Sequence, residues 1–175
     1  MKVLRSAVTF LLAGAMMMSL AGCAKKIEPL KAKDFKDALE NALDVDEDEY
    51  LEIDNDNVEV VMYSEGKYVM LYRQYDDEDD AADWFEDTLD DFEDAVDDKD
   101  FTGRHRQVYN ENGGYGYILF NGENEGSGEL MGDGHIYGGI YWAEDTIVYI
   151  FCASDKDKYI DGVNAVLREL GYPRP

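Results

Sequence analysis

The chain has 175 residues, with 16 Lys and Arg against 40 Asp and Glu and a formal net charge of −24. This length suits one domain of ordinary size with enough chain to bury a core. So acidic a surface repels other polyanions, which excludes nucleic acid as a partner, makes an anionic membrane face a poor one, and favours cations and basic surfaces. The 13 Tyr, 7 Phe and 2 Trp, spaced among Val, Ile and Leu, indicate a folded domain rather than an acidic disordered chain.

The first residues have the pattern of an export signal. Lys2 and Arg5 precede an apolar and small-residue run, residues 7–20, which leads into Ala21-Gly22-Cys23. A basic start, a short apolar core and a small-residue cleavage site are typical of a secretory signal peptide. The run is shorter than the roughly 20 apolar residues that a membrane-spanning helix needs.

The stretch Leu20-Ala21-Gly22-Cys23 resembles the lipobox of bacterial lipoproteins, in which signal peptidase II cuts just before the cysteine. The resemblance implies that residues 1–22 are removed as a signal peptide. It also implies that Cys23 carries a diacylglyceryl thioether and an amine acylated with a fatty acid such as palmitate. The protein would then be lipid-anchored at the extracytoplasmic face of the cell membrane. Two or more acyl chains anchor stably, whereas one binds only marginally.

Removing residues 1–22 takes away two basic residues and no acid, which changes the net charge from −24 to −26. Residues 23–32 show no periodicity, and we expect them to form a short lipidated tether in front of a single acidic domain at residues 33–175. Five lysines cluster around this tether, where anionic headgroups would attract them. They are Lys25, Lys26, Lys31, Lys33 and Lys36.

The domain is expected to alternate helices and hairpins. Apolar residues recur at helical spacing in three segments and at strand spacing or in apolar runs in six others, whereas residues 44–57 and 121–134 read as irregular. The predicted helices are residues 33–43, 81–96 and 155–170. The predicted strands are residues 58–63, 67–75, 104–110, 114–120, 135–143 and 146–153.

This order, α-β-β-α-β-β-β-β-α, predicts an α+β fold: a two-layer domain with an antiparallel sheet of about six strands and three helices packed mainly on one face. Residues 146–153 are nearly all apolar and predict a central strand covered on both faces. Gly138-Gly139 predicts a bulge or a close backbone approach. Ser154 and Asp157 form the pattern of a capping box, and Gly171 is expected to end the last helix.

Residues 60–92 and 136–170 share the order strand, turn, strand, helix, which suggests an internal duplication with equivalent packing. The element order, the lipobox and the closing Leu170-Gly171-Tyr172 also resemble a group of predicted lipoproteins from anaerobic gut Firmicutes, whose function is unknown. That resemblance carries no catalytic residue and no cofactor to this chain.

Three acidic segments are candidates for calcium binding, and each lacks part of what a calcium site requires. Asp44, Asp46 and Asp48 have the spacing of an EF-hand loop, but Glu49 stands where the loop needs Gly. The segment that begins at Asn121 lacks the final bidentate Glu, and residues 76–80 precede a predicted helix whose N-terminus favours acids. No metal-ligand set is predicted, although weak Ca²⁺ binding remains an alternative to a solvated acidic surface.

Gly103-Arg104-His105-Arg106 is the strongly basic cluster of the acidic body. It predicts either an anion site or ion pairs with the neighbouring acidic helix. The aromatic residues of the last hairpin predict either a stacking surface for sugars or peptides or ordinary cross-strand packing. They are Tyr137, Tyr141, Trp142 and Tyr149.

The sequence offers no recognisable catalytic set. It has two His, no His-x-x-x-His, no nucleophile elbow and no phosphate-binding loop. Cys152 is the one cysteine besides Cys23, and its apolar surroundings predict a small buried hydrophobe. We therefore expect a non-enzymatic binding or assembly module at the cell envelope, with a protein or cationic partner. The alternatives are a hydrolase that cuts envelope or other polymers with a carboxylate pair, and a weak divalent-cation-binding surface protein.

Overall fold

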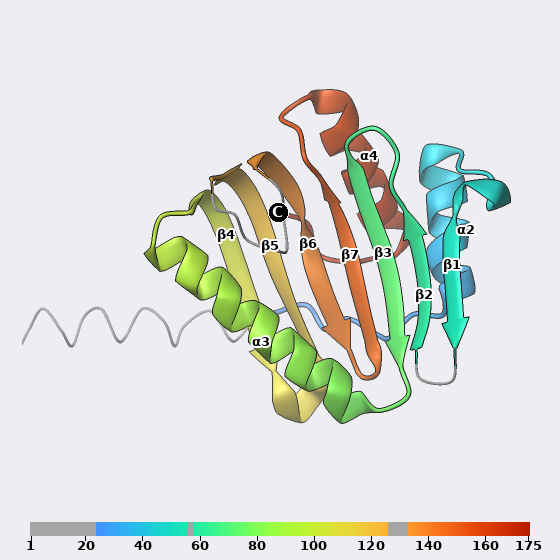
Figure 1. Ribbon diagram of the computed structural model, residues 1–175, viewed down its shortest axis with the longest axis horizontal. Helices are drawn as coiled ribbons and strands as arrows, with labels where there is room; N and C mark the ends of the chain where they lie inside the picture. Colours follow the sequence, from blue (N-terminus) through green and yellow to red (C-terminus); the bar gives the residue numbers. More distant parts are fainter. Residues whose placement is uncertain (1–23, 56–57, 126–132) are drawn as a thin grey trace, which may run out of the picture.

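The structure is a computed structural model that describes residues 24–55, 58–125 and 133–175. These residues form three α-helices and a seven-stranded antiparallel sheet (Figure 1). The helices are α2 (Ala32–Leu43), α3 (Glu78–Asp97) and α4 (Asp157–Glu169), and two short 3-10 turns are η2 (Glu47–Glu49) and η3 (Glu111–Gly113). The strands are β1 (Leu51–Asn55), β2 (Val58–Tyr63), β3 (Tyr68–Tyr75), β4 (Phe101–Asn110), β5 (Tyr115–Asn124), β6 (Gly134–Ala143) and β7 (Thr146–Cys152).

The α+β class and the element order are confirmed, with one strand more than expected. The strands lie in the order β1-β2-β3-β7-β6-β5-β4, and each neighbouring pair is antiparallel. The additional strand, β1, lies in the acidic stretch expected to be irregular and pairs Leu51 with Met62 of β2. Its apolar and acidic residues alternate, as strand side chains on opposite faces do, but the run is short and charged.

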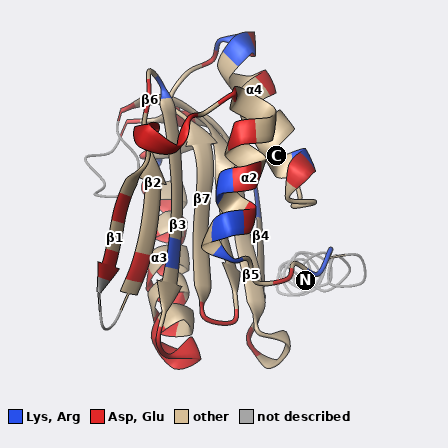
Figure 2. Cartoon of the chain, turned by 90° about the vertical axis from the view of Figure 1, so that its right-hand side faces the viewer, with Lys and Arg blue, Asp and Glu red and all other residues tan. Residues whose placement is uncertain are grey.

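The helices cover both faces of the sheet, so the layer arrangement differs from the expected one. Phe85 and Phe92 of α3 pack in one apolar cluster with Ile118, Ile140 and Ile147 of the sheet. The other cluster combines buried residues of α2 and α4 with the opposite face, and its helical members are Phe35, Ala38, Leu39, Val163, Val166 and Leu167. In Figure 1 α3 crosses in front of the strands and α4 lies behind them, and in Figure 2 α2 and α4 lie together to the right of β3.

Strand β7 is the centre of this arrangement. It lies in the middle of the sheet order, and six of its seven residues are buried, which confirms the prediction of a strand covered on both faces. Gly138 of β6 allows a close approach: a Cβ there would lie 2.2 Å from the carbonyl oxygen of Ile150. The strands pair without interruption through this point, so the paired glycines mark close contact rather than a bulge.

The internal-duplication hypothesis predicted equivalent packing of two hairpin-helix units, and it is wrong in that respect. The hairpins β2-β3 and β6-β7 meet at the β3-β7 pair, as two related units would. However, α3 follows β3 onto one face of the sheet, whereas α4 follows β7 onto the other. A twofold rotation that exchanges the antiparallel strands β3 and β7 would leave both helices on the same face.

The two ends of the domain meet on the face that carries α2 and α4. Ile27 is 3% exposed, the Tyr172 hydroxyl donates to the Glu28 carbonyl at 3.0 Å, and the Lys25 ammonium donates to the Gly171 carbonyl. The tether expected at residues 23–32 is therefore packed on the body over the part that the structure describes, residues 24–32. None of the described helices is both long and apolar enough to cross a membrane.

The end of α4 directs the C-terminal tail across the sheet. Gly171 has φ of 67°, and the N–H groups of Gly171 and Tyr172 donate to the carbonyls of Arg168 and Leu167 at 3.1 and 2.8 Å. This pattern is a Schellman motif, in which glycine takes the left-handed conformation at low cost, so the expected helix stop is confirmed. The expected capping box is wrong: the helix begins after Lys156, whose N–H donates to the Ser154 hydroxyl.

Candidate functional site

The basic cluster of β4 divides between the two faces of the sheet. Phe101 and His105 contact Phe92 of α3, with ring centroids 5.2 and 5.8 Å apart. Because successive side chains of a strand point to opposite faces, Arg104 and Arg106 lie on the face away from α3. The interpretation that these arginines pair with the acidic helix is therefore wrong, and the interpretation as an anion site is the one that the geometry leaves.

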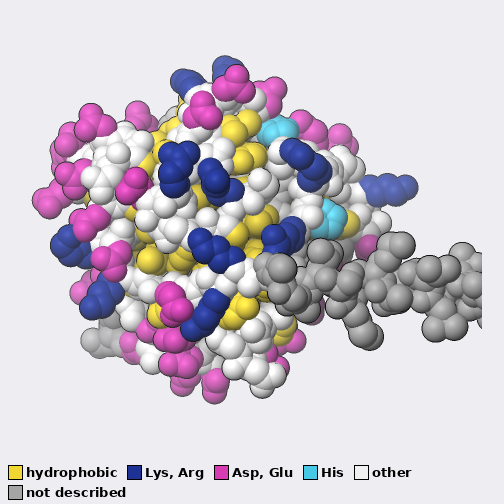
Figure 3. Space-filling model, turned by 180° about the vertical axis from the view of Figure 1, so that it is seen from behind, with side chains coloured by type: hydrophobic (Ala, Val, Ile, Leu, Met, Phe, Trp, Pro, Cys, Tyr) yellow, Lys and Arg dark blue, Asp and Glu magenta, His cyan; other side chains and the backbone are white. Residues whose placement is uncertain are grey.

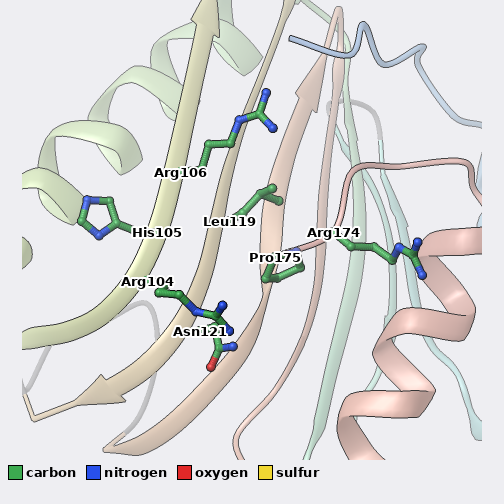
Figure 4. Close-up of a pocket in the computed structure, with 7 residues that line it drawn as sticks. All are labelled: Arg104, His105, Arg106, Leu119, Asn121, Arg174 and Pro175. Atoms are coloured by element: carbon green, nitrogen blue, oxygen red, sulfur yellow. The ribbon is translucent and has the colours of Figure 1, made fainter. Parts of the chain in front are cut away.

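Arg104 and Arg106 line a groove of about 240 Å³ between β4, β5 and the C-terminal tail. Figure 4 shows Leu119 and Asn121 of β5 on its floor and Pro175 on its far side, with His105 turned away toward α3. Arg174 lies across the groove from β4, and its guanidinium group is directed toward α4. The tail is held in place because the Tyr141 hydroxyl donates to the Pro173 carbonyl at 2.8 Å.

Arg106 is fixed by a buried tyrosine. Its guanidinium donates to the Tyr117 hydroxyl at 3.1 Å and lies 5.6 Å from the centroid of the same ring. Burial raises the pKa of Tyr117, while the Arg106 guanidinium and the backbone N–H of Lys25 act in the opposite direction. The same hydroxyl therefore joins the groove to the N-terminal segment, and the chain that follows Cys23 lies next to the arginines.

None of the three arginines forms a salt bridge with another described residue. The ion pairs within residues 24–55, 58–125 and 133–175 are Lys26–Glu28, Lys33–Asp37, Lys36–Glu52 and His135–Glu123. Figure 3 shows Lys and Arg side chains spread over this face, with Asp and Glu mostly toward its periphery. Arginine suits carboxylate and phosphate oxygens, so this unpaired set favours an anionic ligand.

The groove also shows what the sequence reasoning missed. Arg174 is one residue from the end of the sequence and was not linked to the basic cluster of β4. Pro173 and Pro175 on either side of it indicated only a chain that leaves the last helix. Gly171 was expected to end the last helix, but the direction in which its turn sends the tail depends on how α4 packs on the sheet.

The acidic segments considered for calcium serve local structure where the structure describes them. Asp44 ends α2 with φ of 59°, and the Glu49 carboxylate accepts from the Asp46 N–H at 2.7 Å. Asp77 is the N-cap of α3 and accepts from the Asp79 N–H at 2.9 Å. Asn121 belongs to β5, and residues 126–132 of the segment that begins at Asn121 lie outside the described residues. Among the described residues, no group of three or more potential metal ligands is found.

The remaining candidates lie in the core. Cys152 is fully buried, as predicted, and burial raises the pKa of its thiol to about 11. Tyr137, Tyr141 and Trp142 are 7% exposed or less, and Tyr149 packs edge-on against Trp84 at 5.6 Å. These aromatic residues are packing residues, so the proposed stacking surface for sugars or peptides is wrong.

A second exposed surface lies at the free edge of β1. Leu51 and Ile53 are 54% and 48% exposed, and they share the α3-side face with Met62 and Val60 of β2. Glu52 and Asp54 alternate with them along the strand. The apolar strip formed by Leu51 and Ile53 therefore lies on one face of β1 and the two acids on the other, where Glu52 pairs with Lys36 of α2.

The predicted lipid-anchor residue, Cys23, lies outside the described residues. Comparison of the chain with family models, with curated proteins and with solved structures gave no significant match.

Proposed function

We propose that this protein is a non-enzymatic, lipid-anchored binding module of the cell envelope, attached to the extracytoplasmic face of the membrane through Cys23. Its binding site is the arginine groove, and its ligand carries phosphate or carboxylate groups. The lipobox pattern supports the anchor. One observation carries the binding proposal: Arg104, Arg106 and Arg174 have no acidic partner among the described residues of a chain with net charge −24.

The position of the groove supports a link between anchor and site. Lys25, two residues after Cys23, lies beside Tyr117, which holds Arg106. A lipid on Cys23 would therefore place the groove at the membrane rather than far above it. The apolar strip of β1 lies on the opposite face of the sheet and remains open to a protein partner.

The anchor is tested by expressing the full chain in a bacterial host that processes lipoproteins, in medium with radiolabelled palmitate. We expect label on the wild-type protein, no label on Cys23→Ser, and full labelling of Cys152→Ala. The last variant is the matched control because these are the two cysteines of the chain. Unlabelled wild-type protein, or label that persists in Cys23→Ser, would contradict the anchor.

The groove is tested with inorganic phosphate as the probe. Thermal unfolding is measured in phosphate and in NaCl of equal ionic strength. We expect phosphate to stabilise the wild-type protein specifically and the Arg104→Gln/Arg106→Gln variant to lose about a hundredfold or more in affinity, since each of the two charged hydrogen bonds contributes about 1.5–3 kcal/mol. Lys67→Gln/Lys156→Gln removes the same charge from exposed positions outside the groove and should bind as the wild type does. Equal loss in both variants would mean general attraction by charge.

A further inference from the structure

The charges of the groove are arranged in a row rather than around one point. Arg104 and Arg106 project from alternate positions of β4, and the Arg174 guanidinium is directed toward α4, across the groove (Figure 4). On the tail side, Arg174 also lines a second hollow together with Lys25, Asn164 and Tyr172. A small anion fits donors that converge on it, whereas a row of separate cations fits a plane of separate anions.

From this arrangement we infer that the groove face lies flat against the bilayer that holds the lipid on Cys23, and that its arginines bind the phosphates of anionic lipid headgroups. The inference rests on the proposed function, because the anchor supplies the membrane. It names the ligand of the groove and the orientation of the domain.

The covalent geometry restricts where the lipid begins. Two residues extend at most about 7 Å, so the Cα of Cys23 lies within that distance of the Cα of Lys25. Lys25 itself is held by Gly171 and lies beside Tyr117. Lys25 therefore lies on the groove face, and a lipid on a residue only two positions before it would hold this face near the membrane.

The acidic helix does not cancel this attraction. Every charged residue of α3 is Asp or Glu, but α3 packs on the opposite face of the sheet from Arg104 and Arg106. Packed layers are about 10 Å apart, so these carboxylates lie more than one Debye length, about 8 Å at physiological salt, beyond the arginines. The membrane therefore senses the acids of α3 only through screening salt, whereas the acids of α2 and α4 share the groove face and lie mostly toward its periphery (Figure 3).

The test uses the full chain, processed and lipidated in the host, purified and reconstituted in phosphatidylcholine vesicles with or without phosphatidylglycerol. A fluorophore is attached through Thr102→Cys, an exposed position on the groove side of β4, or through Asp87→Cys on α3. Cys152 does not compete for the label because it is fully buried. Quenching by a lipid with a nitroxide headgroup then reports which side faces the membrane.

We expect strong quenching at position 102 and weak quenching at position 87 in vesicles with phosphatidylglycerol. Arg104→Gln and Arg106→Gln should each lower the equilibrium constant for the orientation with the groove on the membrane about fivefold, so the difference in quenching should shrink. It should persist in the matched control Lys67→Gln/Lys156→Gln. Far-UV circular dichroism and thermal unfolding of each variant show that the exposed substitutions leave the fold unchanged.

The outcomes separate the two proposals. Protein that fails to float with vesicles in molar NaCl lacks the anchor, which overturns the proposed function and this inference together. Protein that floats but is quenched equally at both positions, or is unaffected by the arginine substitutions, overturns the orientation alone. If the difference is the same in vesicles without phosphatidylglycerol, the arginines do not bind anionic headgroups and the lipid assignment is wrong.

Discussion

The Tyr172 hydroxyl donates a hydrogen bond to the Glu28 carbonyl at 3.0 Å, across 144 positions of the chain. This contact joins the N-terminal segment to the tail that follows α4. It is the clearest sign that residues 24–31 belong to the folded body, and the arginine groove is built on the same junction.

Removing this hydroxyl should loosen the junction. We expect Tyr172→Phe to lower the free energy of unfolding by about 1 kcal/mol, because the Glu28 carbonyl loses its hydrogen-bond donor. Hydrogen exchange should rise first in residues 24–31. Tyr109→Phe is the control, since Tyr109 is exposed and its hydroxyl lies 3.5 Å from Glu86. A Tyr172→Phe protein with unchanged exchange in this segment would contradict the role of the junction.

The left-handed turn at Gly171 is expected to matter for both stability and binding. Gly171→Ala should cost about 1 kcal/mol because alanine is strained at φ of 67°, although no atom lies within 4 Å of the added Cβ. Gly171→Asn should cost less, since asparagine tolerates this conformation. Urea denaturation gives the stabilities. Phosphate affinity should follow the same rank, because the turn places Arg174.

The acidic residues at the end of α3 oppose the helix dipole. The last turn of α3 contains no basic residue, and Asp97 is exposed there. We expect Asp97→Asn to stabilise the protein by about 0.3–1 kcal/mol and Asp79→Asn, in the first turn, to destabilise it by a similar amount. Thermal unfolding at low and high salt measures both. Changes in stability of the same sign for both variants would show that net charge, rather than the helix dipole, determines the effect.

Calcium and sodium should act alike at matched ionic strength. The described acidic residues form helix ends, turns and an exposed helix face, so salt is expected to raise the melting temperature by screening their mutual repulsion. A rise specific to millimolar Ca²⁺ would instead support the cation-binding alternative. A site at 100 times its dissociation constant adds about 2.7 kcal/mol, which thermal unfolding detects easily.

Alkaline pH should unfold the protein through its tyrosines. Burial, followed by nearby carboxylates, raises the pKa of Tyr50 from 10.0 to about 12, and burial likewise raises the pKa of Tyr141 and Tyr172. A raised pKa in the folded state stabilises the protein fully below the unfolded value, and this contribution is lost as the pH rises from 10.0 toward the folded value. Stability should therefore fall between about pH 10 and 12. Tyrosinate absorbance should rise together with loss of circular dichroism, whereas tyrosines that titrate with the fold intact would contradict the burial argument.

Sequence patterns were sufficient for most elements of the fold. The helices followed from apolar stripes, and residues 146–153 were recognised as a doubly covered strand because nearly every residue is apolar. β1 was missed because it is only five residues long and its two apolar residues, Leu51 and Ile53, alternate with acids and remain exposed. A strand is formed there because β2 offers a free edge, which no local pattern reveals.

Periodicity could not predict which face of the sheet each helix covers. Both α3 and α4 have one apolar stripe, and a stripe indicates that a helix is buried on one side without saying against which face of the sheet. Predicting the groove from the sequence required the same information about tertiary packing. The basic residues of β4 were identified as a candidate anion site, but Arg174 and Lys25 joined them only through tertiary packing of the tail and the N-terminal segment.

The place of β7 in the sheet has a consequence for how the protein is made. The strands before it form two separate groups, β1-β2-β3 and β6-β5-β4, and only β7 joins them, between β3 and β6. A chain that emerges N-terminus first therefore exposes the paired edges of both groups until residues 146–152 appear. Such late closure by distant segments slows folding. If the chain is exported as the proposed function requires, this order would keep the sheet incomplete until residues 146–152 have crossed the membrane.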